Sequence, residues 1–168
     1  VAVDMAYAQK VVTISRFKGM HGSGSILGGG LLDFTGGSAQ YRLQLESPGI
    51  KLAGLPLAIV EKGAELKGEV EFTYEMEGSG FDGLPDRADL KVLSPQVGIN
   101  QYPLRDVTAS ARYRRGKLQV DLRDATFHAN FEGTLALDGR LQLSGSVDLN
   151  DIGNLPPPLK ITTLHGSA

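Results

Sequence analysis

The chain alternates between apolar and polar residues over much of its length. The clearest run is Glu65 to Glu77, where every even position from Leu66 to Met76 is apolar or glycine and every odd position is polar. A period of two places one set of side chains on each face of a β-strand, whereas a helix would spread the glutamates around its circumference. At about 3.3 Å per residue this strand would be about 40 Å long, longer than most strands of globular proteins.

The same alternation predicts strands along most of the remaining chain. We expect them at Val1–Ala8, Lys10–Phe17, Gln40–Leu45, Ala88–Leu93, Val107–Arg114, Leu118–Arg123, Phe127–Leu137 and Leu141–Leu149, with a last strand over Leu159–Leu164. Asp138-Gly139 is the strongest hairpin signal, and Arg115-Gly116 marks a second turn. The only helical segment that we expect is one turn within Leu55–Gly63.

Glycine and proline divide these strands. The glycine-rich stretch Gly19–Gly37 is interpreted as strand broken by bulges or bends. The content of Gly, Pro and Asp in Gly78–Asp86 predicts a loop.

The chain also contains an internal repeat, because Tyr41–Leu57 resembles Ala88–Leu104. Both segments carry a Ser-Pro pair, and Pro48 and Pro95 set an offset of 47 residues. A fixed period is typical of repeat architectures, although chance similarity between strands of like composition is the alternative. Proline cannot donate to a strand ladder, so we expect each Ser-Pro to lie where a strand kinks at a sheet edge.

Composition narrows the function classes. The 168 residues are 41% hydrophobic, with a net charge of −2 and no cysteine. This size suffices for one domain with a sizeable core. The charge gives no sign of nucleic-acid binding, and the lack of cysteine excludes disulfides, thiolate metal sites and cysteine nucleophiles.

No group of residues suggests catalysis. Gly22–Gly28 resembles a phosphate loop, but strand rather than a helix N-terminus follows it. His21, His128 and His165 lack metal-ligand spacing, and His128 falls on the polar face of its strand, which predicts a solvated side chain. The glutamates of Glu65–Glu77 form a solvent face. We therefore expect no enzyme activity, no cofactor and no metal.

Two groups of charged residues each allow both a binding role and a simple surface turn. Asp82, Asp86 and Asp89 could crowd a cation within one loop, but their spacing differs from the EF-hand and an ordinary polar turn is the simpler interpretation. The basic segment Arg112–Lys117 lies at a hairpin tip. It is either a solvated turn or a contact for anionic lipid headgroups.

An antiparallel sheet with one apolar face must bury that face. Long strands with interior glycines favour sharp curvature, so we expect an all-β fold: a long, strongly curved, mostly antiparallel sheet that forms a U-shaped groove or a flattened open barrel with an apolar interior. The residues that we expect to face the groove and contact lipid are Leu43, Leu45, Leu66, Val70, Phe72, Tyr74, Met76, Leu90, Val92, Leu118, Val120, Phe127, Phe131, Leu135, Leu141 and Leu143.

The sequence pattern of these strands resembles that of a known family. The sequence from Glu132 to Gly145 repeats Gly and Leu at regular intervals, and the module from Pro103 to Gly139 has a Pro-Leu lead-in, a strand of small residues, a turn, and two further strands. Both features resemble the AsmA/TamB superfamily, most clearly over Pro103–Leu149 and more weakly over Gly22–Val70. The N component of type II secretion, a smaller relative, fits about as well.

The resemblance implies a protein of the bacterial periplasm that is tethered to the inner membrane by a segment outside this chain. It implies a non-enzymatic groove that shields phospholipid acyl chains on their way to the outer membrane. The implied partners are phospholipids or other acyl-chain lipids and outer-membrane assembly or secretion proteins. It provides no catalytic residue. On this interpretation residues 1–168 are one groove domain, cut from a longer protein.

Two other function classes stay open. The chain could be a structural module of a secretion or assembly machine, with its apolar face buried against itself or a partner. It could also be a β-sandwich enzyme or a sugar-binding domain, although the absence of tryptophan counts against sugar binding. In a groove segment the terminal strands, near Val1 and near Leu164, would have unpaired edges, which predicts self-association that increases with concentration.

Overall fold

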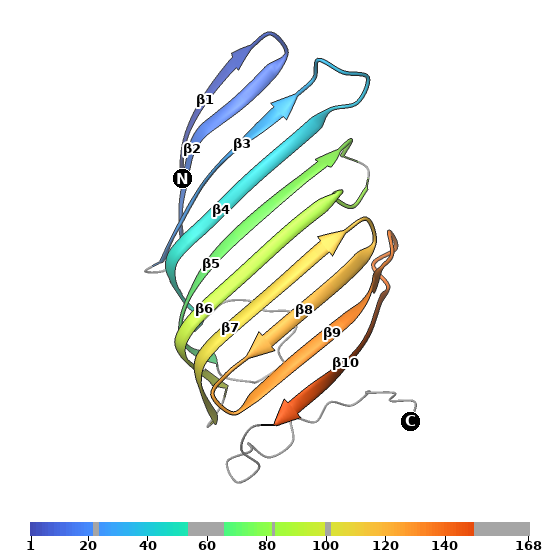
Figure 1. The fold of residues 1–168 in the computed structure, drawn as a ribbon. Helices are drawn as coiled ribbons and strands as arrows, with labels where there is room; N and C mark the ends of the chain where they lie inside the picture. Colours follow the sequence, from blue (N-terminus) through green and yellow to red (C-terminus); the bar gives the residue numbers. More distant parts are fainter. Residues whose placement is uncertain (22–23, 54–65, 82, 100–101, 150–168) are drawn as a thin grey trace.

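The chain folds into β-strands throughout the part that the structure describes. The computed structural model describes residues 1–21, 24–53, 66–81, 83–99 and 102–149, and within them it contains strands and turns but no helix (Figure 1). The strands are β1 (Ala2–Ala8), β2 (Val11–His21), β3 (Gly24–Asp33), β4 (Gln40–Lys51), β5 (Leu66–Ser79), β6 (Arg87–Ile99), β7 (Tyr102–Arg114), β8 (Lys117–Arg123), β9 (Phe127–Leu135) and β10 (Leu141–Leu149). The segments Leu55–Gly63 and Leu159–Leu164, for which we predicted a helical turn and a strand, lie outside these residues.

All ten strands belong to one antiparallel sheet in which each strand pairs with its neighbours in sequence, from β1 at one edge to β10 at the other. The sheet is curved and does not close into a barrel (Figure 1). The predicted fold class, an all-β chain forming a long, curved, open antiparallel sheet, is confirmed.

The strand register places most of the large apolar residues of the ten strands on one face. Residues that lie opposite each other in an antiparallel ladder point to the same side. Leu43 of β4 lies opposite Met76 of β5, and Phe72 of β5 lies opposite Val92 of β6. We call this side the apolar face and the opposite side the polar face.

Strands β4 to β7 bend toward one end of the sheet (Figure 1). The bend coincides with breaks in register between Ser47 and Ile50 of β4, and between Gly68 and Glu71 of β5. Gly68 has a φ of 112°, and a Cβ at this position would lie 2.4 Å from a backbone oxygen of β6. Glycine is therefore required where β5 passes the bulge.

Each Ser-Pro pair lies at one of these breaks, so the predicted kink is correct but its predicted place at a sheet edge is wrong. Strands β4 and β6 are interior. The physical reason is that a bulge interrupts the ladder locally, so Pro48 and Pro95 can lie in interior strands without a missing hydrogen bond.

The two serines of the repeat make the same contact. Ser47 Oγ donates to the backbone oxygen of Ser25 on β3 (2.7 Å), and Ser94 Oγ donates to that of Glu69 on β5 (2.5 Å). Both serines are buried, at 3% and 4% exposure. In both of these similar segments a hydroxyl thus ties the bend to the preceding strand.

The tight turns follow the expected chemistry. Arg115 and Gly116 both have positive φ in the β7–β8 hairpin, as does Gly139 between β9 and β10. Several predicted boundaries change. Strands β2, β4 and β6 continue beyond their predicted ends to His21, Lys51 and Ile99, β7 begins earlier, at Tyr102, and β9 ends at Leu135. Strand β5 continues through Gly78 to Ser79, and Gly19–Gly37 contains the end of β2 and all of β3 instead of one broken strand.

The buried core is small and lies near the bend. Leu52, Val97 and Val107 form a buried cluster on the apolar face, with Leu66 and Leu122 among the residues packed against it. Among the described residues no large side chain is less than 2% exposed. A single sheet covers its own side chains only laterally, so most of the apolar face is half-buried.

Candidate functional site

The apolar face is the candidate site, because the register brings all sixteen predicted groove residues onto it. Fourteen of them are half-buried. The other two, Leu141 and Leu143 on β10, are 51% and 42% exposed. Their proposed contact with lipid stays a prediction, but their common orientation is a property of the fold.

The face is continuous across the strands. Leu45 lies opposite Tyr74, and Tyr74 lies opposite Leu90 on the next strand. Further along, Val120 lies opposite Phe131. Cross-strand pairs of aromatic and branched side chains stabilise a sheet by about 0.2–1 kcal/mol each, so this face contributes to the stability of the fold and to the site.

The apolar face extends farther than the sequence predicted. On β1 and β2 it includes Val3, Met5, Tyr7, Val12 and Ile14. Met5 lies opposite Ile14 and Tyr7 opposite Val12, and Ile14 lies opposite Gly30 of β3, which in turn lies opposite Leu43. The alternation of Val1–Ala8 predicted the strand, but only the register joins it to the face. Exposure increases toward this edge, reaching 69% at Met5 and 70% at Tyr7.

Tyr74 illustrates how this face accommodates a hydroxyl group. Its hydroxyl donates to the sulfur of Met76 at 3.3 Å. Burial, with a smaller contribution from nearby Tyr41, raises the pKa of Tyr74 above its ordinary value. The phenol therefore stays neutral at physiological pH, which suits an apolar surface.

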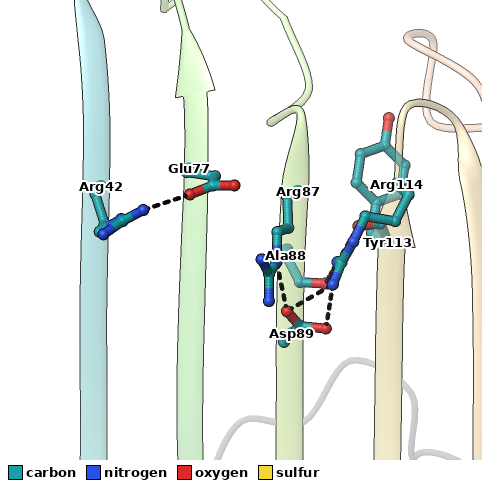
Figure 2. A network of polar contacts seen from close by, with 7 residues as sticks. All are labelled: Arg42, Glu77, Arg87, Ala88, Asp89, Tyr113 and Arg114. Atoms are coloured by element: carbon teal, nitrogen blue, oxygen red, sulfur yellow. Dashed lines mark hydrogen bonds and ion pairs between the residues drawn. The ribbon is translucent and has the colours of Figure 1, made fainter.

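The polar face carries a network of ion pairs (Figure 2). Arg42 on β4 pairs with Glu77 on β5 at 3.1 Å. Asp89 on β6 accepts a hydrogen bond from Arg87 Nε at 2.9 Å. Both of its carboxylate oxygens also lie close to Arg114 Nη2, at 2.8 and 2.9 Å. These pairs link β4 to β5 and β6 to β7 from the solvent side.

Asp89 is the centre of this network. Its partial burial favours the neutral acid, but the hydrogen bonds from Arg114 and Arg87 outweigh that effect, so the pKa of Asp89 lies below its ordinary value. Because two arginines already hold this carboxylate, the polar-turn interpretation fits Asp89 better than a cation site. Asp82 lies outside the described residues.

His128 differs from the prediction of a solvated side chain. It lies on the polar face as expected, but its Nε2 is 2.7 Å from Asp121 Oδ2, and Arg123 Nε is 3.1 Å from the other oxygen. The hydrogen bond with His128, followed by that of Arg123, holds the pKa of Asp121 below its ordinary value. The histidine is thus part of a surface cluster with Asp121 and Arg123.

A hollow of about 680 Å³ lies on the polar face beside the bend. Leu27, Pro48 and Leu93 line it together with Lys91 and Arg112. Sequence reasoning missed these apolar residues. The sequence does carry a sign of two of them: Leu27 and Leu93 each follow another apolar residue, so each breaks the alternation and places an apolar side chain on the polar face.

Other kinds of site find little support. The described residues include no group of three or more His, Asp or Glu side chains placed to hold a metal ion. Nor do they form a helix with the length and hydrophobicity needed to cross a bilayer. Within Arg112–Lys117, Arg114 is engaged by Asp89 and Arg115-Gly116 forms the turn.

Comparison with known proteins adds no relative. No protein-family model, no curated protein and no solved structure matches the chain. The resemblance to the AsmA/TamB superfamily therefore stays a prediction.

Proposed function

We propose that this chain is a non-enzymatic lipid-transfer segment, whose apolar face shields phospholipid acyl chains between the inner and outer membranes of a bacterium. The observation that carries the proposal is the continuous apolar face of an open ten-stranded sheet. No other described element covers this face. On this proposal the chain works in the periplasm, tethered to the inner membrane through a segment outside it, as the AsmA/TamB resemblance implies.

The chemistry of the face suits an acyl chain. Its side chains are aliphatic and aromatic, with Leu43, Val70, Phe72, Val120 and Phe131 among the half-buried ones. The ion pairs of Arg42, Asp89 and Asp121 lie on the opposite face. A hydrocarbon chain on the apolar face therefore meets no charge, while the charged face keeps the sheet in water.

The energetics suit transfer more than storage. Each methylene that leaves water for an apolar surface gains about 0.8 kcal/mol. Relative to a bilayer the same methylene gains almost nothing, because both environments are apolar. The face therefore lowers the cost of crossing the aqueous space without holding the lipid more tightly than the membranes do.

Neighbouring residues on opposite faces provide a matched test. A photo-crosslinking amino acid placed at Phe72 or Phe131, in bacterial cells that produce the protein, should capture phospholipid. The same group at Glu71 or Glu132, one residue away on the polar face, should not. Equal lipid labelling at all four positions would contradict the proposal.

The alternative is a structural or interaction module of a secretion or outer-membrane assembly machine. The exposed edge strands β1 and β10 favour it, because such edges offer backbone groups to a partner. In the same experiment this alternative gives protein adducts at Phe72 and Phe131 in place of lipid adducts.

A further inference from the structure

The two edge strands differ from the rest of the sheet in exposure. Strand β1 has a neighbour only on the β2 side, and all seven of its residues are exposed. Among the described residues, β10 pairs with β9 alone, and residues 141–148 are exposed. Each edge therefore presents a row of backbone groups without a ladder partner inside the described sheet.

On β10 the outward groups belong to residues of the apolar face. The amide of Ala136 donates to the oxygen of Arg140, and in an antiparallel ladder hydrogen-bonded pairs alternate with non-bonded pairs. Gln142 and Ser144 therefore bond to β9, and the N–H and C=O groups of Leu141, Leu143, Gly145 and Val147 point away from the sheet. The bond from Leu135 N to Gly116 O agrees, because it directs the odd residues of β9 toward β8.

The same holds on β1. Gln9 and Lys10 both have positive φ, which is the two-residue hairpin turn closed by a hydrogen-bonded pair, here Ala8 and Val11. The amide of Phe34 donates to Lys10 O, which directs the even residues of this part of β2 toward β3. The outward backbone groups of β1 therefore belong to the odd residues, namely Val3, Met5 and Tyr7.

These two rows are complementary. Successive strands of the sheet alternate in direction, so β1 and β10 run in opposite directions. If β10 of one copy lies beside β1 of another, the pair is antiparallel, and hydrogen-bonded residues point their side chains to the same face. The ladder and the apolar face both continue across such a junction.

Glycine placement limits the register: Gly145 leaves room for one of the three large outward residues of β1, and Met5 is the central one of them. Gly28, Gly30 and Gly133 each lie opposite a large apolar side chain on both neighbouring strands, as Gly133 does with Leu118 and Leu143. Gly145 lies opposite Phe131 on one side and has no described neighbour on the other. Met5 of a second copy would fill that side, and the same register sets Tyr7 opposite Leu143 and Val3 opposite Val147.

Neither edge carries the usual protection against pairing. Lysine, proline and inward charges normally block exposed edges. Strand β1 has one charged residue, Asp4, and β10 has one, Asp148, with no lysine or proline in either strand. We propose that β10 of one copy pairs with β1 of a second copy, with Met5 opposite Gly145, so that copies join head to tail into one longer sheet. The two surfaces differ, so the contact is heterologous, and the number of joined copies increases with concentration.

Edge-blocking variants of the whole chain test this proposal by light scattering. Proline at position 143 or 5 removes an outward N–H and leaves the internal ladder intact. The wild-type mass should increase with concentration above the 17.9 kDa of one chain, while Leu143→Pro and Met5→Pro should each stay monomeric. An equimolar mixture of the two variants should give dimers and nothing larger, because only one competent edge of each kind remains. Circular dichroism verifies the strand content, and Leu143→Lys and Met5→Lys replace any variant that fails to fold.

Every other result overturns the proposal. A monomeric wild type excludes pairing, and association that survives both blocks points to the apolar face instead. Loss of association in only one variant indicates β1–β1 or β10–β10 pairing.

Because the chain has no cysteine of its own, disulfide cross-linking between introduced cysteines can test the register between two copies. The proposed register sets Ala6 opposite Ser144 in a non-bonded pair, with Cα atoms about 4.5 Å apart, within disulfide range. Mild oxidation of mixed Ala6→Cys and Ser144→Cys chains should give a heterodimer several-fold faster than Ala6→Cys mixed with Ser146→Cys. Equal rates would contradict the register.

Discussion

Removal of the Ser94 hydroxyl tests how the sheet bends. This side chain is 4% exposed, and its Oγ lies 2.5 Å from the oxygen of Glu69 and 3.0 Å from that of Gln96. The bulge interrupts the β5–β6 ladder at Glu69, so Ser94→Ala leaves that carbonyl without its donor. An unsatisfied buried group costs about 1–3 kcal/mol. For a chain of this size that corresponds to a decrease in Tm of about 2–12 °C.

Urea unfolding followed by circular dichroism measures this cost, with Ser144→Ala as the matched control. Ser144 Oγ makes a 3.4 Å contact at an exposed position, so its loss should change the unfolding free energy by less than about 0.5 kcal/mol. Ser47→Ala should resemble Ser94→Ala, and the double variant should be additive, since two strand spacings, about 10 Å, separate the sites. If Ser94→Ala is as mild as Ser144→Ala, the hydroxyl does not hold the bend.

Two further predictions concern packing and charge. Gly30→Ala places a Cβ 2.7 Å from the backbone oxygen of Arg42 and should destabilise the sheet by about 1–3 kcal/mol. In the control variant Gly37→Ala the added Cβ meets nothing within 4 Å, so the urea midpoint should stay unchanged. Equal midpoints for the two variants would show that β3 and β4 separate at little cost. Asp89 has a lowered pKa in the folded state, so its ionised form contributes stability that is present above about pH 4 and is lost as the pH falls through the lowered pKa. Asp89→Asn should therefore be less stable than the wild type at pH 7, with a difference that narrows in acid; a difference that stays constant from neutral pH into acid would contradict the role of the two arginines.

The alternation of apolar and polar residues predicted the fold class and the orientation of the candidate site. Period-two runs such as Glu65–Glu77 assign each side chain to a face without knowledge of strand order. Asp138-Gly139 and Arg115-Gly116 also predicted their turns, because few residues other than glycine adopt positive φ at low cost.

What the sequence did not predict depends on register between strands. The positions of Pro48 and Pro95 required knowledge of which strands are interior and where the ladder is interrupted. The contact of His128 with Asp121 crosses the β8–β9 hairpin, and the pairing of Arg123 with His128 in that ladder is visible only in the structure. The outward rows of β1 and β10 likewise depend on which residues of each hairpin exchange hydrogen bonds.

The absence of tryptophan permits a direct measurement of lipid contact. Phe131→Trp and Glu132→Trp each introduce a single tryptophan, on the apolar and polar face respectively, in a chain with no background signal. The purified variants are titrated with a phospholipid that carries bromine atoms in its acyl chains, which quench tryptophan fluorescence on contact. The proposed function predicts strong, saturable quenching of Phe131→Trp and little change in Glu132→Trp. Equal quenching of the two variants, or none in either, would contradict the claim that the apolar face of this sheet holds acyl chains.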